Sequence, residues 1–144
     1  MGTRTRVLWM GALAAALGGV IIVSLGQWDR PRPARSTRHD LMLVYVGAED
    51  CAPCRTWQGT AAASFRSSPE FARVSYREVK SPRLLDVLND EYWPDDLRQY
   101  RGRLSRGAGV PLWLVISDHE IVESGFGTSQ WSSAVLPKLR SLLR

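Results

Sequence analysis

The chain holds only two cysteines, Cys51 and Cys54, and two residues separate them in the stretch VYVGAEDCAPCRTWQ. A pair at this C-x-x-C spacing can bind a metal, form a structural disulfide or exchange electrons with other disulfides. A structural zinc site needs four ligands, and the remaining candidates are His39 and His119, with no second cysteine pair. A disulfide stabilises a fold by closing a long loop, whereas this pair closes almost none. The sequence therefore favours redox catalysis, with no metal and no cofactor apart from a disulfide between the two cysteines.

The residues on either side of the pair predict a strand followed by a helix. Residues 41–46, LMLVYV, form a short apolar run typical of a strand that is buried on both faces. After Cys54, residues 55–66 predict a helix that carries three apolar side chains on one face, Trp57, Ala61 and Phe65. The pair would then lie at the helix N-terminus, where unpaired N–H groups and the helix dipole stabilise an attacking thiolate. The second thiol, one turn along, can then displace the bound partner.

The remaining elements predict an α/β domain with a mixed sheet. Residues 72–79 alternate as in a strand, and residues 112–117 and 120–126 predict a hairpin around Asp118 and His119. A polar helical segment is predicted over residues 83–104, with Leu84, Leu85 and Leu88 on one side. A final helix is predicted from Ser129, and Pro137 either kinks this helix or lies near its true start. We interpret Trp57 and Trp113 as residues of the hydrophobic core and not as substrate contacts. Asp95 and Asp96 are interpreted as acids at a helix start and not as catalytic groups.

The net charge of +5 does not indicate a nucleic-acid partner, because it is unevenly distributed. Residues 1–40 hold six arginines against two aspartates, whereas residues 41–144 are almost neutral. A domain so close to neutrality lacks the basic surface that binds phosphates.

The N-terminal part of the chain predicts a membrane segment. Val7–Leu25 is a run of 19 residues without a charge, and as a helix it would span about 28 Å, close to the hydrocarbon thickness of a bilayer. We expect residues 1–26 to be an uncleaved anchor, although Ser24–Gly26 leaves open a cleaved signal peptide. Residues 27–40, rich in arginine and proline, predict an extended tether, and residues 41–144 form the domain.

Two stretches resemble the thioredoxin-like thiol-disulfide oxidoreductases. They are VYVGAEDCAPCRTW, a strand that runs into C-x-x-C and a helix, and GVPLWLVI, a Val-Pro dipeptide that opens a strand. The resemblance covers roughly residues 40–144. It implies a thioredoxin-like three-layer fold with a central mixed sheet of about four strands, here preceded by a transmembrane helix. It also implies a cis peptide bond before Pro111 and places this proline beside the cysteine pair.

The resemblance also implies roles for individual residues. Cys51 would attack the disulfide of a partner protein, and Cys54 would resolve the mixed disulfide. The residues expected to set the geometry of the site and to dock the substrate are Ala52, Pro53, Val110 and Pro111. Three charged neighbours are expected to tune the ionisation of the attacking thiol: Arg55 in favour of the thiolate, and Glu49 and Asp50 against it. A less stabilised thiolate favours a reductase over an oxidase.

The sequence departs from the family at several positions. The buried acid of the family, six residues before the first cysteine, falls on Tyr45, so proton transfer to and from Cys54 would need Glu49, Asp50 or water. The tryptophan and glycine around the first cysteine of thioredoxin are replaced by Asp50 and Ala52, and the family's first strand and helix are absent before residue 41.

The implied location and partners follow from the members that the chain resembles most. These are bacterial domains held on the outer face of the inner membrane, where many reduce exported proteins. Two arginines precede the apolar run and four follow it, so charge alone favours a cytoplasmic domain, and the periplasmic location rests on the resemblance. The resemblance predicts a single-pass inner-membrane protein with a periplasmic domain, an upstream electron donor and protein thiols or disulfides as substrates. A non-catalytic module that binds or chaperones a partner, and a disulfide-forming oxidase, remain as alternatives.

Overall fold

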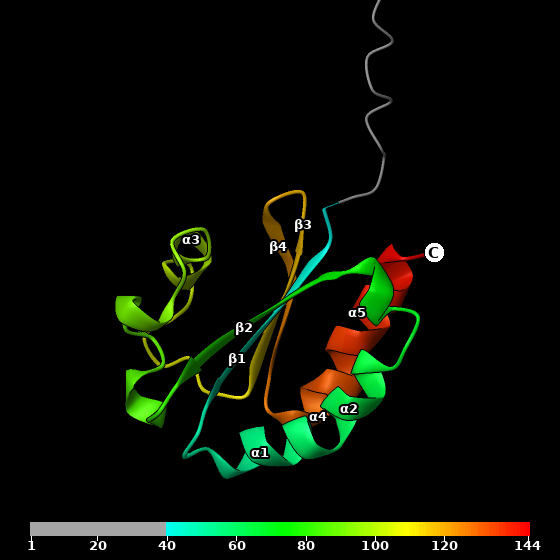
Figure 1. Cartoon of the computed structure of the whole chain (residues 1–144). Coiled ribbons are helices and arrows are strands. Elements are labelled where there is room, and N and C mark those ends of the chain that lie inside the picture. Colours follow the sequence, from blue (N-terminus) through cyan, green and yellow to red (C-terminus); the bar gives the residue numbers. More distant parts are fainter. Residues whose placement is uncertain (1–39) are drawn as a thin grey trace, which may run out of the picture. The chain divides into compact units, whose positions relative to one another are not determined.

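The computed structural model describes residues 40–144, and in these residues one four-stranded mixed sheet lies at the centre (Figure 1). Its strands are β1 (Met42–Ala48), β2 (Ser75–Ser81), β3 (Leu112–Ser117) and β4 (Glu120–Phe126), in the order β2-β1-β3-β4. The pairing of β1 with β2 is parallel, and β3 pairs antiparallel with both β1 and β4. The predicted mixed sheet is therefore confirmed.

The segments predicted as a membrane anchor and a tether lie outside the described residues, except for Asp40 at the end of the tether. Within residues 40–144, no helix combines the length and the apolar character that a membrane crossing requires.

Helices cover both faces of the sheet and give three layers. Figure 1 shows α1, α2, α4 and α5 together on one side, and α3 on the other. Their bounds are α1 Ala52–Gly59, α2 Ala61–Arg66, α3 Arg98–Arg101, α4 Thr128–Gln130 and α5 Leu136–Leu142. A 3₁₀ turn at Phe71–Arg73 precedes β2, and a π-helical turn at Trp131–Val135 joins α4 to α5.

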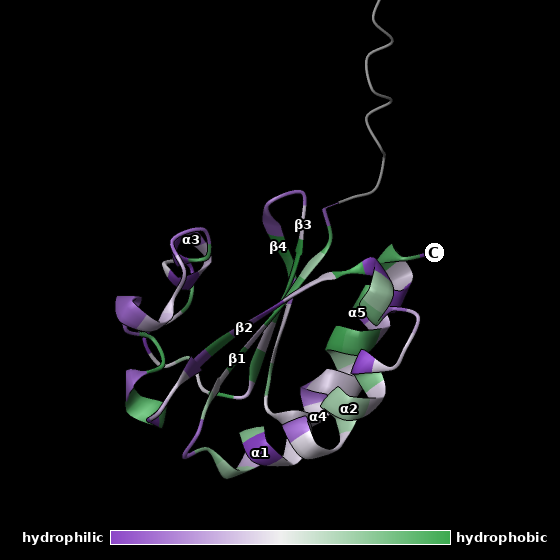
Figure 2. Ribbon diagram, in the orientation of Figure 1, coloured by the Kyte–Doolittle hydropathy of each residue, from purple (hydrophilic) through white to green (hydrophobic). Residues whose placement is uncertain are grey.

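The alternation of β1 side chains builds a separate core on each face of the sheet. Val44 and Val46 pack in one apolar cluster, which also contains both cysteines. Tyr45 packs in the other, with Trp57 and Trp113, so these two tryptophans are core residues as predicted. Figure 2 shows hydrophobic residues along the central strands and hydrophilic ones in the turn between β3 and β4.

The prediction of a helical segment over residues 83–104 is largely wrong. The structure has two 3₁₀ turns, Leu84–Asp86 and Asp90–Tyr92, followed by the single turn of α3. Pro94 has no N–H and disfavours helical backbone at Trp93, whose indole N–H donates to the carbonyl of Val87 at 2.8 Å. The side chains that fill the core are Val87, Trp93, Leu97 and Tyr100, whereas Leu84 and Leu85 face solvent.

The last helical stretch begins at Thr128, as α4, so Pro137 lies inside this stretch and not at its start. Pro137 is the second residue of α5, and the hydrogen-bond pattern changes to a π-helical turn directly before α5, which fits a backbone that lacks the proline N–H. The π-helical turn immediately before α5 continues the helical path and buries Trp131 and Val135.

Candidate active site

The sheet brings four loops together at one end of the domain. The register pairs Ala48 at the end of β1 with Ser81 at the end of β2. It also pairs Leu112 at the start of β3 with Phe126 at the end of β4. The cysteines follow β1, and the Val110–Pro111 segment precedes β3, so both lie at this end of the sheet.

Cys51 and Cys54 form a disulfide at the N-terminus of α1, with their Cα atoms 5.2 Å apart. Cys51 is the N-cap residue of α1, and its Sγ accepts the backbone N–H of Cys54 at 3.2 Å. This N–H donor would also stabilise negative charge on the Cys51 sulfur after reduction.

The two cysteines differ in their accessibility. Cys51 is 5 % exposed, whereas Cys54 is completely buried in the apolar cluster beneath the loop. Ala52 and Pro53 between them are exposed in the first turn of α1, where the fixed φ of proline suits the helix start. An approaching molecule therefore meets Cys51 before Cys54.

The Val110–Pro111 segment lies directly beside the disulfide. Its peptide bond is cis, as the resemblance implied, and the Val110 carbonyl oxygen lies 3.8 Å from the Sγ of Cys51. Val110 and Pro111 are both buried, so they form part of the wall behind the sulfur. The structure thus brings these two residues together with Cys51, Ala52, Pro53 and Cys54.

Three charged residues near the disulfide form contacts that brace its loop. The Asp50 carboxylate accepts the backbone N–H of Leu84 at 2.7 Å, and the Arg55 guanidinium donates to the carbonyl oxygen of Glu49 at 2.6 Å. The Glu49 N–H in turn donates to the carbonyl of Ser81 at 3.0 Å. The contact between Asp50 and Leu84 joins residues 34 positions apart, and sequence reasoning had no signal for it.

Tyr45, which takes the position of the family's buried acid, packs on the sheet face opposite the Cys54 cluster. Its ring stacks on Trp57 with centroids 4.6 Å apart, and its hydroxyl accepts Nε2–H of Gln58 at 3.0 Å. Burial raises the pKa of the Tyr45 hydroxyl above its ordinary value of 10.0, so it stays neutral at physiological pH. Tyr45 therefore joins β1 to α1 but supplies no carboxylate beside Cys54.

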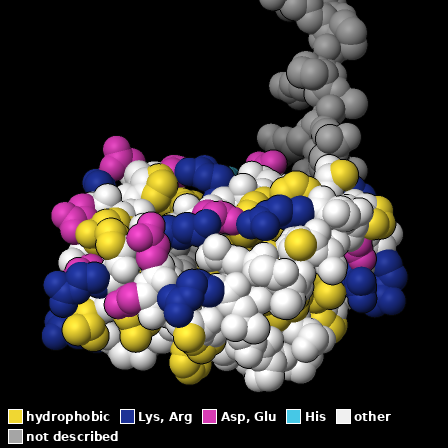
Figure 3. All heavy atoms as spheres, turned by 60° about the horizontal axis from the view of Figure 1, so that its bottom comes forward, with side chains coloured by type: hydrophobic (Ala, Val, Ile, Leu, Met, Phe, Trp, Pro, Cys, Tyr) yellow, Lys and Arg dark blue, Asp and Glu magenta, His cyan; other side chains and the backbone are white. Residues whose placement is uncertain are grey.

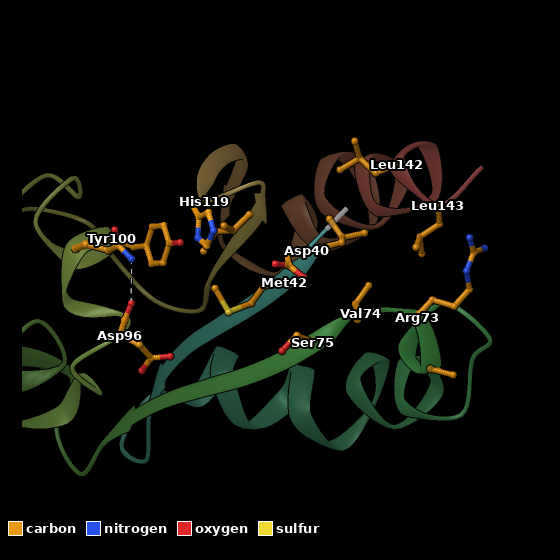
Figure 4. A pocket seen from close by; sticks show the side chains of 14 residues that line it. Asp40, Met42, Arg73, Val74, Ser75, Asp96, Tyr100, His119, Leu142 and Leu143 are labelled. Atoms are coloured by element: carbon orange, nitrogen blue, oxygen red, sulfur yellow. Dashed lines mark hydrogen bonds between the residues drawn. The ribbon is translucent and has the colours of Figure 1, made fainter. Parts of the chain in front are cut away.

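A cavity of about 940 Å³ lies at the opposite end of the sheet (Figure 4). Its walls come from the beginnings of β1 and β2, the end of β3 and the C-terminal part of α5, and include Tyr100 and His119. No cysteine lines it. In the part of the chain from residue 40 onward, no three histidine, cysteine, aspartate or glutamate residues are grouped so that they could hold a metal ion.

The comparisons with known proteins find similarity in structure but not in sequence. No protein-family model matches the chain, and no curated protein matches it. The periplasmic thioredoxin SoxS from Paracoccus pantotrophus, in its reduced form, has a TM-score of 0.51 at 13 % identity, over 72 % of this chain and 99 % of that chain. Thioredoxin f from spinach chloroplast gives 0.49 at 12 % identity, over 74 % and 79 %. Fasciola hepatica thioredoxin gives 0.45 at 22 % identity, over 67 % and 79 %. The match to the Paracoccus protein shows that this chain has the thioredoxin-like fold, as predicted.

Proposed function

We propose that the chain is a membrane-tethered thiol-disulfide oxidoreductase that reduces disulfides of exported proteins. The observation that carries this proposal is the disulfide at the N-terminus of α1, with Cys51, the more exposed of the two cysteines, as N-cap and Cys54 fully buried behind it. The thioredoxin-like fold and the Val110–Pro111 segment beside Cys51 support it.

The reaction proceeds in two exchange steps that conserve electrons. In the reduced protein the Cys51 thiolate attacks one sulfur of a substrate disulfide, whose S–S bond breaks as a mixed disulfide forms. The released substrate thiolate takes up a proton. Cys54 then loses its proton and attacks the Cys51 sulfur, which forms the Cys51–Cys54 disulfide and releases the second substrate thiolate, and this thiolate also takes up a proton. The substrate gains two electrons and two protons, and an upstream dithiol donor supplies the same number when it regenerates the protein.

The proposal includes the direction of the disulfide exchange and the location of the domain. Glu49 and Asp50 place two carboxylates next to the Cys51 loop, which disfavours a thiolate and hence favours a reductase. The apolar run Val7–Leu25 is long enough to anchor the chain in the inner membrane, with the domain in the periplasm.

The test is dithiol-driven reduction of insulin by the full-length chain. We expect the wild-type protein to accelerate insulin precipitation by dithiothreitol and the Cys51→Ser protein to give only the uncatalysed rate. Lys138→Ser, a change at a half-buried position of α5, is the control and should retain full activity. Activity in Cys51→Ser would contradict the assignment of Cys51 as the nucleophile, and inactivity of the wild type would favour a non-catalytic binding module.

The same preparation distinguishes a reductase from an oxidase. The oxidised protein is mixed with a reduced peptide that holds two thiols, and the rate of peptide oxidation is compared with the rate of insulin reduction by the reduced protein. We expect the reduction to be faster. Faster oxidation would show that the chain introduces disulfides.

A further inference from the structure

The cavity at the end of the sheet opposite the disulfide has the size of a ligand site. Its volume of about 940 Å³ lies within the range of about 300–1,000 Å³ that is usual for pockets that bind small molecules. At the disulfide end, which Figure 3 turns forward, hydrophobic side chains are interspersed with charged ones of both signs. The cavity instead has a largely apolar lining, which includes Leu41, Met42, Val74, Ile116, Leu142 and Leu143.

Two opposite charges line the cavity without pairing with each other. Asp40 precedes β1 and Arg73 precedes β2, and the register that pairs Met42 with Ser75 places the two at facing positions. Opposite charges at such positions attract each other. Within residues 40–144, however, neither side chain takes part in an ion pair. In Figure 4 the Asp40 carboxylate lies on the side of Met42, whereas the Arg73 side chain extends toward the side of Leu143.

The other carboxylate in the cavity wall already has a partner. Asp96 accepts two hydrogen bonds from the Arg77 guanidinium, at 2.7 and 3.3 Å. Arg73 also borders a smaller hollow beside Arg140, whose guanidinium donates to the Glu70 carboxylate at 2.7 Å. Among the lining residues, Arg73 is therefore the cation that is open to an anionic group, and Asp40 is the carboxylate that is open to a cationic one.

The cavity lies at the end of the domain that continues into the predicted tether. Asp40 belongs to the cavity wall and is also the last residue of that tether, residues 27–40. A chain of this length spans at most about 50 Å, so the lipids around the predicted anchor stay within reach of the cavity. A membrane lipid combines an apolar chain with a charged headgroup, and the cavity combines an apolar lining with two charges.

We propose that this cavity binds a membrane phospholipid whose zwitterionic headgroup ends in a primary ammonium group, as in phosphatidylethanolamine. Arg73 binds the phosphate, and Asp40 accepts hydrogen bonds from the ammonium group. One acyl chain, about 15 Å long or half the hydrocarbon thickness, lies along the apolar lining, which crosses three strands over about 10 Å and continues to Leu143. The bound lipid keeps the disulfide end turned away from the bilayer. This inference rests on the proposed function only for the membrane location of the chain.

The test replaces Ala72, an exposed residue of the cavity wall, by the photoreactive p-benzoylphenylalanine in the full-length chain. The protein is placed in vesicles of phosphatidylethanolamine and phosphatidylglycerol, in equal amounts and with identical acyl chains. Irradiation joins the benzophenone to the occupant of the cavity, and mass spectrometry of the tryptic peptides identifies it. We expect phosphatidylethanolamine adducts to exceed phosphatidylglycerol adducts about threefold, the size of one exposed charge pair. The same replacement at Ser124, which is exposed in β4 and outside the cavity, is the control and should give at most a tenth of the lipid adduct.

Variants assign the headgroup contacts to the two charges. Arg73→Gln should lower the total lipid adduct about threefold, since it removes the partner of the phosphate. Asp40→Asn should bring the ratio of the two adducts to about one, since it removes the group that favours the ammonium. Arg106→Gln and Asp95→Asn make the same changes at exposed positions outside the cavity wall, and both the total and the ratio should stay unchanged.

The contrary outcomes are distinct. An adduct with a peptide from residues 1–39 would show that the chain itself fills the cavity, and a covalent dimer would show that a second copy does. Either result, or the absence of a lipid adduct, overturns the inference. Equal amounts of the two lipid adducts in the parent protein, or an unchanged total in Arg73→Gln, overturn the assigned headgroup contacts. Insulin reduction by the same vesicles tests the proposed redox function separately, because the cavity contains neither cysteine.

Discussion

Replacing Gly47 by alanine should destabilise the domain, because the ring of Tyr45 occupies the space that a side chain at position 47 would need. Tyr45 and Gly47 lie on the same face of β1, two residues apart. A Cβ atom added at Gly47 would lie 2.7 Å from the Cζ atom of Tyr45 and 3.0 Å from its Cε1 atom. Carbon atoms in contact are normally about 3.5–4.0 Å apart, so the ring has to move.

The cost follows from how firmly the ring is held. Tyr45 has no exposed surface, stacks on Trp57 and accepts a hydrogen bond from Gln58. Displacement of its ring therefore disturbs the packing of α1 against the sheet. Overpacking of this kind costs about 1–3 kcal/mol in the free energy of unfolding. For a domain of this size, that corresponds to a melting temperature lower by roughly 4–15 °C. Thermal unfolding of the oxidised full-length chain, followed by far-ultraviolet circular dichroism, measures the change.

Gly59→Ala is the matched control, since it makes the same chemical change at an open position. Gly59 is the last residue of α1, and an added Cβ atom would have no neighbour within 4 Å. We expect this variant to be more stable than the wild type by about 0.4–1 kcal/mol. Equal stability of the Gly47→Ala protein and the wild type would refute the packing of Tyr45 against the backbone of β1.

Two further predictions concern pH and membrane topology. Burial raises the pKa values of Tyr45 and Tyr76 above the ordinary 10.0, so the unfolded chain loses these protons near pH 10 while the folded domain keeps them. The contribution of these tyrosines to the stability of the domain should therefore be complete below pH 10 and decrease as the pH rises further. Tyr76→Phe should make this decrease smaller, as measured by urea unfolding at pH 9, 10 and 11. An unchanged pH dependence in that variant would contradict the role of Tyr76. Alkaline phosphatase fused after Arg144 should be active, as a periplasmic domain requires, and a fluorescent protein that folds only in the cytoplasm should stay dark at the same position. The reverse result, an inactive phosphatase and a bright fluorescent protein, would place the domain in the cytoplasm.

The strands and the position of the cysteine pair could be predicted from the sequence because their signals are local. The apolar run that becomes β1, the hairpin of β3 and β4, and the C-x-x-C at a helix start each depend on neighbouring residues. The cis peptide bond at Pro111 came from the resemblance alone, since residue spacing gives no information about it.

The segment between β2 and β3 could not be predicted, because long-range contacts decide its conformation. The sequence predicted a helix with Leu84 and Leu85 on one side, but both lie in a 3₁₀ turn that is held by Asp50, which is far away in sequence. Propensity also favours helix in this segment, and the packing of Trp93 against the sheet overrides it.

The most direct test of the central claim is to trap substrates with a Cys54→Ser variant in cells. If Cys51 attacks and Cys54 resolves, this variant keeps the N-terminus of α1 but cannot release the mixed disulfide. We predict that complexes of higher mass accumulate on non-reducing gels and disappear with reductant, and that a Cys51→Ser variant, whose remaining thiol is buried, traps far less. Trapping by Cys51→Ser but not by Cys54→Ser would show that the roles are reversed, and no trapping by either variant would contradict the proposed redox function.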